Sequence, residues 1–111
     1  MKLLPVAVAA LLLIPVSPVA RAEEMPTFRL TIRQGHFIPE AMEVPAGKKF
    51  RLLLKNEGPG PEEFESAELR KEKVLAEGAE SFLIFQALAP GSYPFFGEFH
   101  PSTARGRIIA R

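Results

Sequence analysis

Five side chains in this sequence have the chemistry and spacing to bind a metal ion. They are the two histidines, His36 and His100, and three glutamates, Glu63, Glu65 and Glu98. In an extended segment, residues at i and i+2 point to the same side, so Glu63 can act with Glu65 and Glu98 with His100. The chain has no cysteine and all of its acidic residues are glutamate. A site built from carboxylates and imidazoles suits Fe²⁺, Mn²⁺, Zn²⁺ and Cu²⁺ better than Cu⁺.

The N-terminal residues predict export. Lys2 precedes a nearly continuous apolar run that ends at Val16, and residues 20–22 read Ala-Arg-Ala, which places small residues where a signal peptidase cleaves. We therefore expect a signal peptide over residues 1–22, a mature domain over residues 23–111 and a periplasmic location.

The mature chain is expected to be one small domain of nearly neutral charge. It has 89 residues, with 12 basic and 13 acidic side chains. This length suits a single domain, and the charge balance gives no electrostatic reason to expect a nucleic acid partner. Two histidines and no nucleophile motif also give little support to a hydrolytic enzyme. Without cysteine there are no disulfides, so the fold must be held together by packing.

Apolar and polar residues alternate along most of the mature chain, which predicts β-strands with one buried face. Turn residues, mainly glycine and proline, separate these stretches. Short strands at this spacing indicate an antiparallel β-sandwich, and a helix is plausible only over residues 68–76, whose charges fit a solvated excursion equally well. The expected strands lie around residues 28–33, 40–44, 49–55, 81–85, 93–96 and 107–110.

The order of these elements and turns resembles that of a cupredoxin. The first half of the resemblance is Phe37-x-Pro39, then Val44-Pro45-Ala46-Gly47-Lys48 and a strand ending at Asn56. The second half is Leu88-x-Pro90-Gly91-x-Tyr93-x-Phe95, a loop with His100, and a strand with Gly106-x-Ile108. The resemblance implies an all-β, single-domain, cupredoxin-like Greek-key β-sandwich of about seven to eight strands.

A closer resemblance is carried by a series of short runs. It consists of Glu63-Phe64-Glu65-Ser66, followed by Leu69 and Glu72-Lys73-Val74, and then Phe95-Phe96-Gly97-Glu98-Phe99-His100-Pro101. This series is similar to segments of the small periplasmic cupredoxin-like proteins associated with bacterial iron permeases. This resemblance implies a role in iron, or alternatively copper, acquisition. The implied partners are an inner-membrane iron permease or another periplasmic metal-binding protein.

Three of the four ligand positions of a blue-copper site are lost in this chain. The resemblance places the first histidine ligand near Glu63, the cysteine at Gly97 and the methionine at Ala104, so only His100 remains. Without a thiolate there is no copper–sulfur bond to tune the potential. Blue-copper electron transfer is therefore excluded.

The topology of such a sandwich brings three loops, around residues 35–40, 56–65 and 97–103, to one end. We therefore predict a metal site formed by Glu63, Glu65, Glu98 and His100, with His36 as a candidate fifth ligand, and either or both of Glu63 and Glu65 binding. The site would hold one divalent iron or copper ion per monomer.

Two functions from different classes follow from these residues. Anionic oxygen ligands stabilise Fe³⁺ more than Fe²⁺, so one hypothesis is a protein that binds Fe(II) and oxidises it as a ferroxidase does. The alternative is a metal-free cupredoxin scaffold that acts as a protein–protein docking or binding module, as the loss of ligands also permits.

Overall fold

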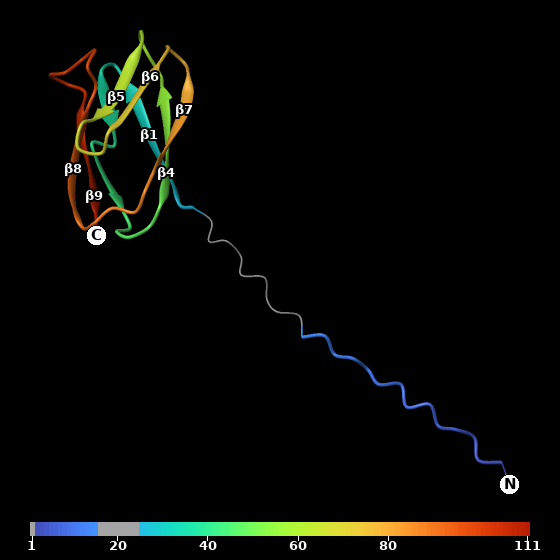
Figure 1. Ribbon diagram of the computed structural model, residues 1–111. Coiled ribbons are helices and arrows are strands. Elements are labelled where there is room, and N and C mark those ends of the chain that lie inside the picture. The colour runs from blue at the N-terminus through green and yellow to red at the C-terminus, as the bar shows by residue number, and fades with distance from the viewer. Residues whose placement is uncertain (1, 16–24) are drawn as a thin grey trace.

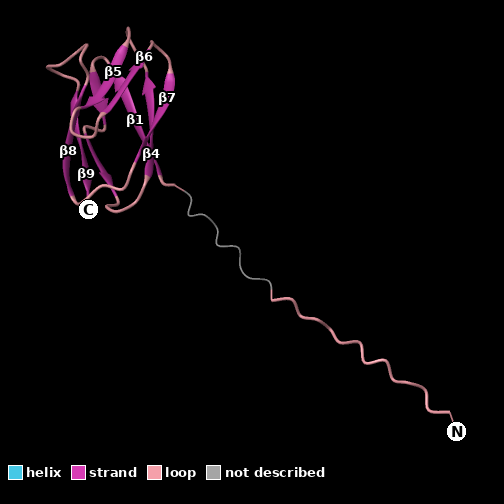
Figure 2. Ribbon diagram, viewed as in Figure 1, coloured by secondary structure: helices cyan, strands magenta, loops and turns pink. Residues whose placement is uncertain are grey.

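The computed structural model describes residues 2–15 and 25–111, and the domain in it consists of strands and loops (Figures 1 and 2). The described residues form nine strands. They are β1 (Thr27–Arg33), β2 (His36–Ile38), β3 (Ala41–Val44), β4 (Phe50–Asn56), β5 (Glu62–Ser66), β6 (Lys71–Leu75), β7 (Glu80–Phe85), β8 (Gly91–Phe96) and β9 (Arg105–Ala110).

Residues 2–15 have no regular secondary structure, and their large apolar side chains are exposed. The predicted cleavage site at residues 20–22 lies outside the described residues, so the signal peptide remains a prediction. Within the described ranges, the structure offers no helix that could span a lipid bilayer.

The strands form two sheets that pack as a sandwich, as the sequence predicts. One sheet has the order β2-β1-β4-β7, and the other has the order β3-β9-β8-β5-β6. The expectation of an antiparallel sandwich holds for the other strand pairs, but β1 pairs with β4 and β3 pairs with β9 in parallel. Parallel neighbours require a long connection between them, and here the chain crosses to the other sheet between the paired strands.

The core between the sheets is built from the alternating apolar residues. Along β4, Phe50, Leu52 and Leu54 are buried while the residues between them are more exposed. The centre of the core is a group of aromatic rings in edge-on, tilted and stacked contacts, with Phe64 at 4.9 Å from Phe95 and 6.3 Å from Phe85 between ring centroids. These contacts fix the position of β5 against the opposite sheet.

The segment 68–76 contains a strand, so the expectation of a helix or a solvated excursion there is wrong. The chain turns at Ala67–Arg70 and returns as β6, which pairs with β5 in antiparallel register. Leu75 is buried and Lys73 and Lys71 are half-buried, so every second residue faces the core despite the charges. Lys71 also lies over the Phe85 ring, with its Nζ 5.6 Å from the ring centroid.

Three loops meet at one end of the sandwich, as predicted. The backbone N–H of Gln34 donates to the carbonyl of Gly58, which joins the β1–β2 turn to the β4–β5 loop. The Thr103 hydroxyl donates to the carbonyl of Gly35 at 2.7 Å, which joins the same turn to the β8–β9 loop. These contacts bring the residues after β4, before β5 and after β8 close together.

Replacing Phe64 by alanine tests the role of the aromatic core. We expect Phe64→Ala to lower the free energy of unfolding by about 3–5 kcal/mol, because it removes a fully buried ring. The matched control is Phe82→Ala, since Phe82 is 53% exposed, and we expect it to cost about 1 kcal/mol or less. Urea denaturation of both variants measures the difference, and equal losses would contradict this account of the core.

Candidate metal centre

The burial of Phe64 decides where the glutamates of β5 point. Successive side chains on a strand face opposite sides, and Phe64 faces the core between the sheets. Glu62 therefore faces the same interior, at the end of the strand, while Glu63 and Glu65 face the outside of the sheet. The five-residue strand thus carries carboxylates on both of its faces.

The turn before β5 is ordered by the buried side chain of Asn56. Its amide nitrogen donates to the carbonyls of Gly60 and Leu75, at 2.8 and 3.2 Å, and its oxygen accepts from the N–H of Gly58. Because these bonds connect the end of β4 with β6, they fix the loop from which Glu62 enters the interior.

At the end of the sandwich where the three loops meet, the buried carboxylate of Glu62 contacts the imidazole of His100. Nδ1 of His100 lies 2.8 Å from Oε1 of Glu62, and the Glu62 side chain is 1% exposed whereas that of His100 is 46% exposed. Neither oxygen of Glu62 accepts a well-formed hydrogen bond from any residue that the structure describes. A buried carboxylate without hydrogen bonds costs several kcal/mol of free energy unless a cation or proton compensates it.

His100 is held by the loop between β8 and β9. The N–H of Gly97 donates to the carbonyl of Ala104, and the carbonyl of His100 accepts from the N–H groups of Thr103 and Ala104. Gly35 has a positive φ of 71°, and a Cβ at that position would lie 2.9 Å from Cγ of His100. A glycine is therefore required where the β1–β2 turn passes the imidazole.

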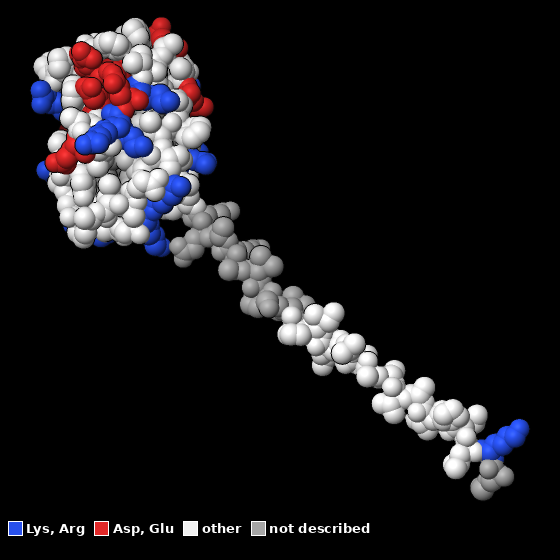
Figure 3. Space-filling view, in the orientation of Figure 1, with Lys and Arg blue, Asp and Glu red and all other residues white. Residues whose placement is uncertain are grey.

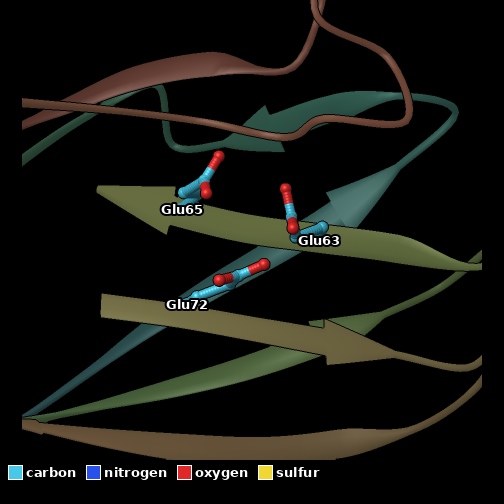
Figure 4. A group of neighbouring side chains, drawn as sticks. All are labelled: Glu63, Glu65 and Glu72. Atoms are coloured by element: carbon cyan, nitrogen blue, oxygen red, sulfur yellow. The ribbon is translucent and has the colours of Figure 1, made fainter. Parts of the chain in front are cut away.

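On the outer face of the same sheet, a second group of acids gathers. Carboxylate oxygens of Glu63, Glu65 and Glu72 lie within 4.8 Å of one another (Figure 4). Glu98 contacts this group, because its backbone N–H donates to Oε1 of Glu63 at 3.0 Å. Figure 3 shows acidic side chains concentrated on the face where β5 and β6 lie, with basic side chains beside them. We call these four residues the outer carboxylate group.

The structure divides the five predicted ligands among three places. Glu63, Glu65 and Glu98 belong to the outer carboxylate group, whereas His100 lies on the inner side of β5. His36 is exposed on β2 beside the buried Phe37, so its side chain points away from the core on the outside of the other sheet.

The expectation that Glu98 and His100 point to the same side is wrong. It assumed an extended segment, but residues 98–103 form successive turns. The carboxylate of Glu98 acts on Glu63 and Glu65, whereas the imidazole of His100 contacts Glu62.

Glu62 is not among the predicted ligands, although the sequence contains the signal that identifies it. The cupredoxin resemblance aligns Glu63, and not Glu62, with the lost histidine ligand. Phe64 is the apolar residue of the segment, so the residue two positions before it shares its inward face. The alternation rule therefore indicates Glu62, not Glu63, as the carboxylate on the inner side.

The two lost ligand positions of the loop are closed by packing. A Cβ at Gly97 would lie 2.7 Å from the carbonyl oxygen of Glu63 and 3.0 Å from Cβ of Ala104. Ala104 is itself fully buried. The start of the β8–β9 loop therefore leaves no room for a larger side chain at Gly97 without a backbone shift.

Burial raises the pKa of Glu63 from 4.5 to about 7, and the neighbouring carboxylates of Glu72, Glu65 and Glu98 add to this rise, whereas the hydrogen bond from the N–H of Glu98 opposes it. The pKa of Glu65 is raised as well, by partial desolvation and by repulsion from Glu72 and Glu98. Mutual repulsion in the outer carboxylate group thus favours uptake of a positive charge.

A pH dependence of stability follows from Glu63. Its pKa is higher in the folded protein than the ordinary value of 4.5, so the folded state binds the proton more tightly. The resulting stabilisation is present below pH 4.5 and is lost as the pH rises to about 7. We expect Glu63→Gln to reduce this slope of the unfolding free energy, measured by urea denaturation between these pH values; an unchanged slope would contradict it.

Comparison with known proteins agrees with the fold. The family model of the cupredoxin-like domain matches residues 5–110. The chain is 41% identical over 81 residues to "Uncharacterized protein RP394" of Rickettsia prowazekii (strain Madrid E), which covers 73% of this chain and 65% of that protein. The chain thus matches less than two thirds of the length of this relative.

Solved structures of copper proteins have a similar fold. The metal-binding domain of the Cu(I)-exporting P-type ATPase CopA of Streptococcus pneumoniae D39, with Cu(I), aligns with a TM-score of 0.68 and 13% identity, over 77% of this chain and 84% of that one. The blue copper protein auracyanin A of Chloroflexus aurantiacus aligns with a TM-score of 0.64 and 16% identity, over 77% of this chain and 98% of that one. The match to the family model extends over nearly the whole sequence, and the chain therefore belongs to the cupredoxin-like domain family.

Proposed function

We propose that this protein binds a divalent iron or copper ion through Glu62 and His100, as an exported accessory protein of metal acquisition. One observation carries the proposal: a carboxylate that is 1% exposed and accepts no well-formed hydrogen bond from the described residues lies 2.8 Å from an imidazole nitrogen. A bound cation would compensate the buried charge. The half-exposed imidazole gives the ion a path from solvent.

The chemistry of the two donors fits a divalent transition metal. An imidazole nitrogen and a carboxylate oxygen suit Fe²⁺ and Cu²⁺, and Cu²⁺ has the higher intrinsic affinity for such donors. The anionic carboxylate stabilises Fe³⁺ relative to Fe²⁺ and so favours transfer of one electron from bound Fe(II) to dissolved dioxygen. Copper binding in vitro is therefore expected even where iron is the ion handled in the cell.

The wider role rests on the sequence. The N-terminal residues have the composition of a signal peptide, which supports export of the domain to the periplasm. The similarity of its two acidic and aromatic runs to iron-permease accessory proteins supports a role beside an inner-membrane iron permease or another periplasmic metal-binding protein. The copper proteins among the similar folds support a metal ion as the ligand.

Substitution of the two inner ligands tests the site. We expect Glu62→Gln, which keeps the size of the side chain, and His100→Ala, at a half-exposed position, to fold and to lose metal binding. At a metal concentration of about 100 times Kd, binding stabilises the native protein by about 2.7 kcal/mol, which raises Tm by about 10 °C or more for a domain of this size. Both variants should lack this rise with Cu²⁺ and with anaerobic Fe²⁺.

The matched control is His36→Ala, which removes the protein's other histidine. We expect it to keep the metal-dependent rise, because His36 lies on the outside of the other sheet. Binding that survives Glu62→Gln and His100→Ala but is lost in Glu65→Gln would move the ion to the outer carboxylate group and contradict the assignment. No response of the unmodified protein to either metal would overturn metal binding and leave the docking module as the function.

A further inference from the structure

We propose that Glu63 is a positioning residue that holds His100 toward Glu62. The inference rests on the proposed function of the inner pair and assigns Glu63 a role through the loop rather than through contact with the ion. Glu63, which the sequence predicts as a ligand, instead orders the loop that carries the ligand His100.

The loop that carries His100 is attached to the rest of the domain on both sides of the imidazole. On its far side, the Thr103 hydroxyl donates to the carbonyl of Gly35 at 2.7 Å. On its near side, the N–H of Glu98 donates to Oε1 of Glu63 at 3.0 Å. The bonds among Gly97, His100 and Ala104 shape the loop itself, so Glu63 and Gly35 are the acceptors that attach it to other elements.

Glu63 is well placed for this role because it is buried on a strand that pairs with a neighbour on each side. It lies in the middle of a sheet between β6 and β8 and is 1% exposed. The backbone at Gly97 passes so close to it that a Cβ there would lie 2.7 Å from the Glu63 carbonyl oxygen. The side chain of Glu63 therefore needs to span only a small gap to reach the N–H of Glu98, the second residue of the loop.

Adjacent residues of β5 contact the loop from its two sides. Glu63 accepts a hydrogen bond from the loop backbone on the outer face, and Glu62 contacts the loop's imidazole on the inner face. Because both side chains extend from one stretch of backbone, the position of the loop backbone and the distance between the two inner donors are coupled. Residues that orient metal ligands in this way typically change affinity by about 10–100-fold when they are replaced.

A pair of variants separates hydrogen bonding from charge. Glu63→Gln keeps a carbonyl oxygen that can accept from Glu98 and loses the charge, whereas Glu63→Leu has a similar size and loses the acceptor. We expect Glu63→Gln to bind Cu²⁺ nearly as tightly as the unmodified protein, and Glu63→Leu to bind it about tenfold or more weakly. Calorimetry with Cu²⁺ measures the affinity, and Glu63→Met serves as the apolar variant if Glu63→Leu does not fold.

A second measurement uses the metal-free protein. Amide hydrogen exchange at Glu98, followed by NMR, should accelerate in Glu63→Leu and stay close to the unmodified rate in Glu63→Gln. Equal loss of affinity in both variants would assign Glu63 a role through its charge or as a ligand, and would overturn the positioning role. Unchanged affinity and exchange in Glu63→Leu would also overturn it.

The failure of this inference is distinguishable from that of the proposed function. If Glu62→Gln and His100→Ala abolish binding but Glu63→Leu has no effect, the inner site stands and the positioning role is wrong. If the unmodified protein binds no metal, the proposed function is wrong, and the exchange rate at Glu98 still decides whether Glu63 holds the loop.

Discussion

The packing of the Phe64 ring between the two sheets is the constraint on which the rest of the site depends. The ring packs against Phe95 and Phe85. Because side chains alternate between the two faces of a strand, the direction of the other side chains of β5 follows from it. Glu62 must lie inside and Glu63 outside. One hydrophobic contact thus places the Glu62–His100 pair and the outer carboxylate group on opposite faces of the same strand.

The inner pair and the loop have opposite effects on stability. Burial of the Glu62 carboxylate, whose close partner is the half-exposed imidazole of His100, costs desolvation free energy. The bonds of Asn56 and Thr103 hold together the loops that surround it. Natural domains have only a small net free energy of folding. The free energy that the aromatic core contributes must therefore exceed the cost of burying the Glu62 carboxylate. A buried carboxylate beside a half-exposed imidazole is an arrangement that a bound cation would stabilise.

The sequence predicted the elements with strong alternation and missed the features that depend on tertiary contacts. β4 could be identified because Phe50, Leu52 and Leu54 alternate with polar residues, and the meeting of the three loops followed from the order of the strands. β6 could not, because Lys71 and Lys73 face the core and hide its pattern. The place of Glu98 depended on turns after Gly97 that no local rule indicated. Glu62 was predictable from Phe64 alone.

The packing around Gly97 limits what protein engineering can introduce at this position. A cysteine there would force the backbone to shift, because its Cβ would meet the backbone of Glu63 and the methyl group of Ala104. A thiolate ligand could therefore be built into this loop only together with changes in the neighbouring strand or at Ala104.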